Sequence, residues 1–139
     1  MKIAVTLLLG AAMAGTPGAA SAQDRPAPRP AFDACMQRAS GVTVDVRACI
    51  SAEHSRQDAL LNTRYRELMQ RLPPERQAAL RAAQRAWIAF READCSYSAS
   101  RDAGGTLEAV MIDSCWMEFT TRRATSLGAD LEFERKYGG

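Results

Sequence analysis

The four cysteines of this chain, at positions 35, 49, 95 and 115, constrain its fold more than any other feature. An even number of cysteines is typical of a protein that folds in an oxidising compartment and closes them into disulfides. Four cysteines allow three pairings. We favour Cys35 with Cys49 and Cys95 with Cys115, because short loops close easily and each pair flanks a predicted turn. Each such loop stabilises a fold by roughly 3 kcal/mol through loop-closure entropy.

The spacing of the cysteines argues against a zinc site. No two of them form the C-x-x-C half-site that structural zinc sites use, and the only histidine is His54. His54 lies between Glu53 and Ser55 on a predicted helix, where we expect a solvated side chain. One histidine without a partnered nucleophile gives little support for acid-base catalysis. We therefore expect neither a bound metal nor another cofactor.

The first 22 residues have the pattern of a secretory signal peptide. Lys2 supplies a positive start, residues 3–14 form an uncharged apolar run, and Ala20-Ser21-Ala22 matches a small-x-small cleavage site. The apolar run is about a dozen residues long, whereas a membrane span takes roughly 20. We expect cleavage after Ala22, which leaves Gln23 rather than a cysteine at the new N-terminus. The mature chain is therefore predicted to be periplasmic or secreted, with no transmembrane segment and no lipid anchor.

The mature chain has the pattern of one helical domain. Residues 23–31 form a Pro/Arg-rich, flexible leader with almost nothing apolar to bury. From Phe32 onward, apolar residues recur at helical spacing, and no stretch alternates as a strand would. These patterns predict an all-α fold over residues 32–128, a small disulfide-clipped bundle of three main helices plus a short leading helix. Residues 129–139 are expected to form a C-terminal tail.

Turn and cap residues set the predicted helix boundaries. Gly41 ends the leading helix, and Pro74 suits the first turn of the third helix because its missing amide hydrogen costs nothing there. Thr43 and Thr106 are expected to cap the second and fourth helices through their hydroxyl groups. Gly128 is expected to stop the fourth helix. The four predicted helices cover residues 32–39, 43–72, 74–98 and 106–128.

Each long helix carries an apolar stripe that predicts its core-facing side. The second helix presents Leu61, Tyr65, Leu68 and Leu72. The third presents Leu80, Ala83, Trp87 and Phe90, and the fourth presents Leu107, Met111, Cys115 and Phe119, with Ile112 and Trp116 beside them. We expect both tryptophans to lie in the core rather than on a binding surface.

Three motifs along these helices resemble those of a known family. They are Leu61-Asn62-x-x-Tyr65-x-x-Leu68 after Cys49, then Leu80-x-x-x-Gln84-Arg85-Ala86-Trp87-Ile88-x-x-Arg91-x-x-x-Cys95, and, after Gly104-Gly105, Cys115-x-x-x-x-Thr120-x-x-Arg123. Together they resemble the LprI-type lysozyme inhibitor family over about residues 35–127. Its members are small exported helical proteins, and the founding member is a mycobacterial lipoprotein that inhibits lysozyme. The resemblance implies that this chain binds lysozyme by protein–protein contact, without catalysis.

We expect the polar residues of these motifs to have structural roles. Long polar side chains on bundle helices often bridge helices through hydrogen bonds and ion pairs. Arg81 and Arg85 are like charges one turn apart, so we expect them to meet carboxylates elsewhere in the fold or an anionic partner. The structural motif comprises Asn62, Tyr65, Gln84, Arg85, Trp87, Arg91 and Arg123.

Charge is unevenly distributed along the chain, although the formal net charge is only +2. Residues 56–91 hold eight arginines against three acids, a local net charge of +5. Residues 92–118 hold six acids against Arg101 alone, a local net charge of −5. In an antiparallel bundle, the acidic segment gathers at the end that holds Cys95, and the basic segment gathers toward the Pro73-Pro74 turn.

The acidic end is the predicted contact surface for lysozyme. Animal-type lysozymes are strongly cationic and hold catalytic carboxylates in a cleft, so acidic side chains can steer the encounter while Arg101 reaches a cleft carboxylate. The alternative is that these acids lie near helix starts, where the backbone dipole favours them, and pair with neighbouring arginines. The predicted contact residues are Glu92, Asp94, Arg101, Asp102, Gly104, Gly105 and Glu108.

The same residues also allow two other function classes. A non-enzymatic envelope binding or scaffold module would use its basic end, Arg64, Arg66, Arg71 and Arg76, to bind an anionic polymer, a lipid headgroup or a partner protein. An enzyme has little support, since there is no nucleophile motif, phosphate loop or metal cluster. Glu92 and Glu118 can act as acid and base only if they share a cleft. We expect no nucleic-acid partner.

Overall fold

The computed structural model describes residues 29–138, so the predicted signal peptide and most of the leader lie outside the described residues. Within residues 29–138 there is no strand, and the all-α prediction is confirmed. None of the helices in this range is long and apolar enough to cross a membrane. The elements are α1 (Pro30–Ala39), α2 (Thr43–Arg71), α3 (Pro74–Ala99), the short 3₁₀ helix η2 (Ser100–Asp102) and α4 (Thr106–Tyr137).

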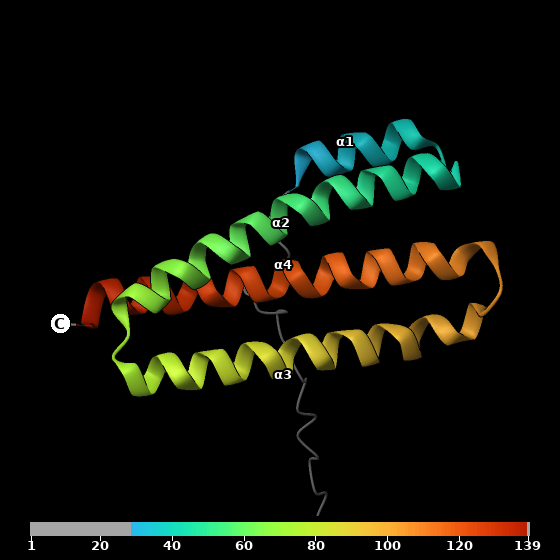
Figure 1. The fold of residues 1–139 in the computed structure, drawn as a ribbon. Helices are drawn as coiled ribbons and strands as arrows, with labels where there is room; N and C mark the ends of the chain where they lie inside the picture. Colours follow the sequence, from blue (N-terminus) through green and yellow to red (C-terminus); the bar gives the residue numbers. More distant parts are fainter. Residues whose placement is uncertain (1–28, 139) are drawn as a thin grey trace, which may run out of the picture.

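Helix α4 lies at the centre of the bundle (Figure 1). Both α2 and α3 pack along α4, whereas they have little direct contact with each other, and α1 packs on the first part of α2. The three long helices run antiparallel in chain order, so the α3–α4 turn lies at the same end of the bundle as the α1–α2 turn (Figure 1). Helix α3 therefore has a single long neighbour, and much of its surface stays exposed.

The core lies between α2 and the second half of α4. Three leucines of the predicted α2 stripe are buried, and Tyr65 packs against them partly buried, which confirms the stripe. From α3 only Leu80 and Trp87 pack against this core. The buried cluster consists of Leu61, Leu68, Leu72, Ala124, Leu127 and Leu131.

Two predicted core residues of α3, Ala83 and Phe90, are exposed instead. Phe90 is 57% exposed and meets Phe119 of α4 edge-on, with 5.7 Å between ring centroids. The prediction was wrong because α3 packs mainly against α4, and one main neighbour covers a narrower stripe than a closed bundle would. Leu107 is also exposed, since it lies in the first turn of α4 next to the loop.

The predicted stop at Gly128 is wrong, because α4 continues through it to Tyr137. Leu131 and Glu134, beyond the glycine, are both buried. Gly128 has a packing role: a Cβ there would lie 2.8 Å from the guanidinium carbon of Arg64. Arg64 donates from Nη1 to the carbonyl oxygen of Ala124 at 2.7 Å. The glycine therefore allows an α2 arginine to lie against the α4 backbone.

The predicted threonine caps are also wrong. Thr43 and Thr106 are the first helical residues of α2 and α4, and Val42 and Gly105 occupy the cap positions without side-chain cap hydrogen bonds. The boundary after α1 is confirmed, with Gly41 at a φ of 80°. Helix α1 itself begins at Pro30, two residues before the predicted start.

Both predicted disulfides are confirmed. Cys35 and Cys49 join α1 to α2 with their Cα atoms 5.7 Å apart, and Cys95 and Cys115 join α3 to α4 with 5.6 Å between Cα atoms. Both crosslinks lie toward the end of the bundle that holds the α3–α4 turn, which places the covalent constraints next to the predicted contact surface.

Candidate functional site

The predicted contact surface is built on the turn between α3 and α4. The Gly105 N–H donates to the carbonyl oxygen of Asp102 at 2.8 Å and closes the turn. Gly104 has a φ of 76°, in the left-handed region that favours glycine. A Cβ at Gly105 would lie 2.9 Å from the same Asp102 oxygen. Backbone geometry therefore requires both glycines.

A largely buried crosslink holds this turn in place. Cys95 has no exposed surface, and its disulfide with Cys115 joins the last turns of α3 to the first turns of α4. Ser100 adds a local hydrogen bond from its hydroxyl to the carbonyl oxygen of Tyr97 at 2.6 Å. The turn is thus a constrained loop rather than a long flexible connection.

Glu108 acts as part of this turn. Its carboxylate accepts a hydrogen bond from the Gly104 N–H at 2.8 Å, and it lies in the first turn of α4. A carboxylate there is stabilised by the positive end of the helix dipole. The observed contact of Glu108 is therefore the one expected from the alternative interpretation, in which an acid stabilises the start of a helix.

The other predicted contact residues differ in position. Arg101 is exposed and Asp102 half-buried in η2, while Glu92 is exposed and Asp94 half-buried on α3. Glu92 lies roughly 12 Å along the helix axis before η2, from the rise per residue of an α-helix. None of these carboxylates forms an ion pair with another residue of the range 29–138. The turn proper thus brings together Arg101 to Glu108, and Glu92 and Asp94 extend it along α3.

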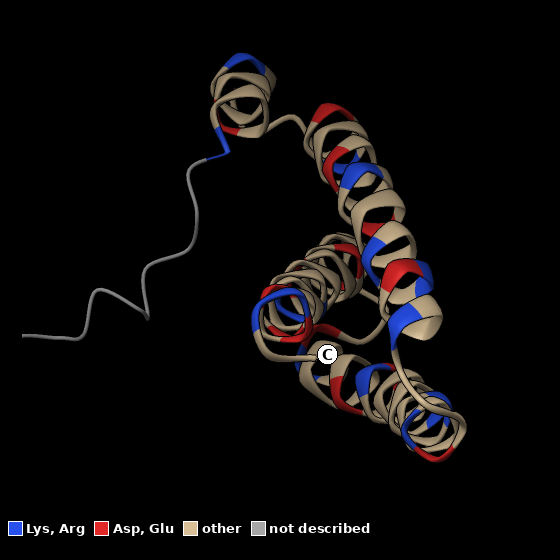
Figure 2. Cartoon of the chain, turned by 90° about the vertical axis from the view of Figure 1, so that its left-hand side faces the viewer, with Lys and Arg blue, Asp and Glu red and all other residues tan. Residues whose placement is uncertain are grey.

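Two acids counted in the acidic segment are neutralised by the fold. Asp113 accepts a hydrogen bond from Arg47 of α2 at 2.7 Å, and Glu118 accepts one from Arg29 at 2.7 Å. Sequence counting missed these pairs because both arginines lie outside the counted segments. Figure 2 accordingly shows both signs of charge on each of the four helices rather than two separate charged halves.

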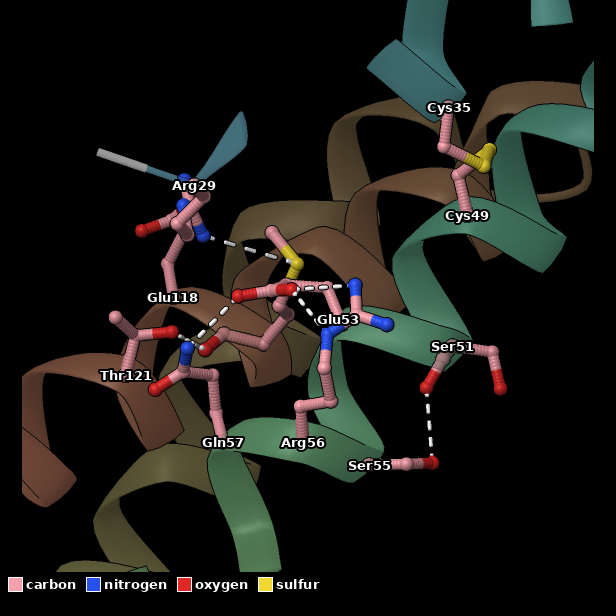
Figure 3. A network of polar contacts seen from close by, with 11 residues as sticks. Arg29, Cys35, Cys49, Ser51, Glu53, Ser55, Arg56, Gln57, Glu118 and Thr121 are labelled. Carbon is pink, nitrogen blue, oxygen red and sulfur yellow. Dashed lines mark hydrogen bonds and ion pairs between the residues drawn. A yellow bond between two sulfur atoms is a disulfide. The ribbon is translucent and has the colours of Figure 1, made fainter. Parts of the chain in front are cut away.

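Figure 3 shows the polar network next to the Cys35–Cys49 disulfide. Glu53 is buried, with 3% of its surface exposed, and accepts hydrogen bonds from Arg56 at 2.7 Å and Gln57 at 2.7 Å. Burial raises the pKa of Glu53, but these hydrogen bonds and the charge of Arg56 outweigh it, so its pKa is lowered overall. Arg29, which the sequence placed in the leader, also stacks on the ring of Phe32 at 4.9 Å.

The predicted basic surface is partly used inside the protein. Arg64 lies against the α4 backbone, and Arg76 donates to the buried carboxylate of Glu134 at 2.6 Å. The hydrogen bond to Glu134 raises the pKa of Arg76. Arg66 and Arg71 remain exposed and form no ion pair with a described residue. Only half of the predicted basic surface is therefore free for a partner.

Comparison with known proteins identifies the family to which this chain belongs. The family model described as lysozyme inhibitor LprI matches residues 35–127, which include both disulfides and the whole α3–α4 turn. The chain belongs to the LprI lysozyme inhibitor family. A relative from Rhizobium meliloti (strain 1021), described as an uncharacterized protein, is 27% identical to this LprI family member over 60% of this chain and 70% of its own length. No solved structure is significantly similar to the chain.

Several motif residues of this LprI family member link α3 to α4. Arg123 donates from Nε to the side-chain oxygen of Gln84 at 3.0 Å. Arg91 donates to the hydroxyl of the buried Thr120 at 3.2 Å. Its guanidinium also lies 4.9 Å from the ring centroid of Trp87 and 5.5 Å from that of Trp116. The two half-buried tryptophans thus enclose a cation that belongs to the same motif.

Asn62 and Arg85 do not tie helices in this way. Asn62 donates its amide to Asp58 on the same helix at 2.8 Å. Arg85 is exposed and forms no side-chain hydrogen bond with a described residue. Both residues line the space between α2 and α3, and neither forms a side-chain hydrogen bond to another helix of residues 29–138.

His54 differs from the solvated side chain expected of it. It is half-buried, and its Nε2 lies 3.2 Å from the hydroxyl of Thr120 on α4. Burial lowers the pKa of His54, and the charge of Arg91 lowers it further. Among residues 29–138, no group of three or more histidine, cysteine, aspartate and glutamate side chains is arranged to hold a metal ion.

Proposed function

We propose that this protein is exported and that it binds and inhibits lysozyme, without catalysing a reaction itself. Membership of the lysozyme inhibitor family over residues 35–127 carries the proposal. The two disulfides support export, since such crosslinks persist outside the reducing cytoplasm. The predicted signal peptide of residues 1–22 is the proposed export signal.

The proposed contact surface is the turn from Arg101 to Glu108, with Glu92 and Asp94 beside it on α3. Its support is charge and rigidity. Glu92, Asp94 and Asp102 are not neutralised by described residues, so their field acts on an approaching cationic enzyme. Arg101 is exposed in η2, at the start of the turn, where its guanidinium can pair with a carboxylate in the enzyme cleft.

The Cys95–Cys115 crosslink supports inhibition by a preorganised loop. A loop that is already held in its bound conformation loses less conformational entropy on association. Exposed charges at the rim of an interface mainly raise the association rate, and salt screens them over a Debye length of about 10 Å at 0.1 M. Inhibition through this surface is therefore expected to weaken as ionic strength rises.

A lysis assay tests the proposed function. The mature chain, residues 23–139 with its cysteines oxidised, is added to an animal-type lysozyme that is clearing a suspension of bacterial cell walls. We expect slower clearing in proportion to the added protein, with less inhibition at high salt. Full lytic activity in the presence of excess oxidised protein would refute the function.

A pair of charge reversals tests the proposed site separately. Asp102→Lys in the turn should raise the inhibitor concentration needed for half-inhibition by roughly five-fold, from the value of a rim ion pair. Glu75→Lys is the matched control, because Glu75 is an exposed acid in the first turn of α3, at the far end of the bundle. Equal inhibition by the two variants would leave the function standing and refute the site.

A further inference from the structure

A pocket of about 340 Å³ lies between α2 and α3, and the proposed inhibition makes no use of it. The pocket exists because both helices pack on α4 rather than against each other. It is lined by Asn62 and Tyr65 of α2 and by Arg81, Gln84, Arg85 and Ile88 of α3. Four of these six residues, Asn62, Tyr65, Gln84 and Arg85, belong to the structural motif identified in the sequence.

The two arginines of the pocket lack counter-charges in the described structure. Elsewhere on α3, Arg76 is paired with Glu134 and Arg91 with the hydroxyl of Thr120. Arg81 and Arg85 form no ion pair with any carboxylate of residues 29–138. Like charges one turn apart destabilise a helix, so an anion bound between them would relieve repulsion that the fold leaves in place.

The neighbouring polar groups of the pocket are mainly donors. The side-chain oxygen of Gln84 accepts from Arg123 at 3.0 Å, which leaves the Gln84 amide nitrogen as a donor. Tyr65 packs against the core and carries a hydroxyl that can donate. One carboxylate, that of Asp58, accepts a hydrogen bond from a residue that lines the pocket. Its donor is Asn62 on α2 at 2.8 Å, and it forms no ion pair with Arg81 or Arg85.

We propose that this pocket binds a small oxyanion, a carboxylate or a phosphate group, between the guanidinium groups of Arg81 and Arg85. Guanidinium groups donate pairs of parallel hydrogen bonds that match either oxyanion, and Gln84 supplies a further donor. Ile88 and the ring of Tyr65 form an apolar wall that suits the carbon skeleton of an organic acid. The volume is at the lower end of small-molecule sites, so the ligand is a small molecule or a single acidic group.

Nuclear magnetic resonance titration of the oxidised mature protein tests this site. Two probes are added separately at constant ionic strength: inorganic phosphate and N-acetylalanine, a carboxylate with a small apolar part. We expect saturable shifts of the Arg81 and Arg85 Nε–H signals and of the Gln84 amide signals. Tighter binding of N-acetylalanine identifies an organic carboxylate as the ligand class, and tighter binding of phosphate identifies a phosphate. Shifts that stay linear with both probes would overturn the proposal.

Charge-matched variants show whether the arginine pair is responsible. Arg81→Gln with Arg85→Gln should weaken binding of the preferred probe by about ten-fold or more, the value of a charge-assisted hydrogen bond. Arg66→Gln with Arg71→Gln is the control, because it removes the same charge from exposed arginines of α2. Binding that falls equally in both variants would show a general charge effect and overturn the site. Circular dichroism of each variant establishes that it is folded.

Discussion

Replacing Gly128 by alanine, in the natural chain and in an Arg64→Ala background, measures the contribution to stability of the close contact between Gly128 and the Arg64 side chain. The Gly128 position lies inside α4, and an added Cβ would approach the Arg64 guanidinium carbon to 2.8 Å. The guanidinium must then move away from the Ala124 carbonyl oxygen, which it now binds at 2.7 Å. Arg64→Ala removes the obstructing group and leaves the helix itself unchanged.

The structure gives two opposing contributions of known size. Alanine in place of glycine inside a helix stabilises by about 1 kcal/mol. Loss of a hydrogen bond from a charged donor costs about 2 kcal/mol. Gly128→Ala should therefore lower the free energy of unfolding by about 1 kcal/mol in the natural chain and raise it by about 1 kcal/mol in the Arg64→Ala background. The coupling free energy between the two positions is then about 2 kcal/mol.

Urea denaturation of the four proteins, followed by helical circular dichroism, measures this cycle. The natural chain, the two single variants and the double variant are compared under oxidising conditions, with both disulfides intact. Slopes that agree among the four proteins establish that their denatured states are comparable. A Gly128→Ala effect of the same sign and size in both backgrounds would show that Arg64 does not occupy the space beside the glycine.

Two further predictions concern the crosslink and the buried acid. Cys95→Ser with Cys115→Ser should lower the free energy of unfolding in urea by roughly 3 kcal/mol, and a loss under about 1 kcal/mol would contradict an entropic role for the loop. Glu53 has a lowered pKa, so it stabilises the fold above its unfolded pKa and loses that contribution as pH falls through the folded value. Below its ordinary pKa of 4.5, the natural chain should therefore lose stability that Glu53→Gln does not lose, and parallel acid denaturation profiles would count against this.

Features with a local cause were predicted well from the sequence. The α2–α3 break follows from the two prolines, and the break after α1 follows from Gly41, because each acts on its own backbone. The prediction of the apolar stripe of α2 was correct because that helix packs one continuous face on α4. The disulfide pairing followed from loop length, since residues close in sequence meet at the lowest entropic cost.

Features that depend on a distant partner were not predicted. Gly128 looks like a helix stop until Arg64 is placed against it. The acidic segment appears uncompensated until Arg29 and Arg47 approach it from other elements. Phe90 appears to be a core residue only if α3 has neighbours on two sides, and the packing gives it one.

The helices, their main breaks, the favoured disulfide pairing and the family could be predicted from the sequence alone. The tertiary structure was needed to see which charges lack an ion-pair partner among residues 29–138: Glu92, Asp94 and Asp102 near the α3–α4 turn, and Arg81 with Arg85 between α2 and α3. The difference arises from the sequence distance between the residues that each feature depends on. Helix formation and loop closure depend on neighbouring residues, whereas the net charge of a surface depends on side chains that come together from distant parts of the chain.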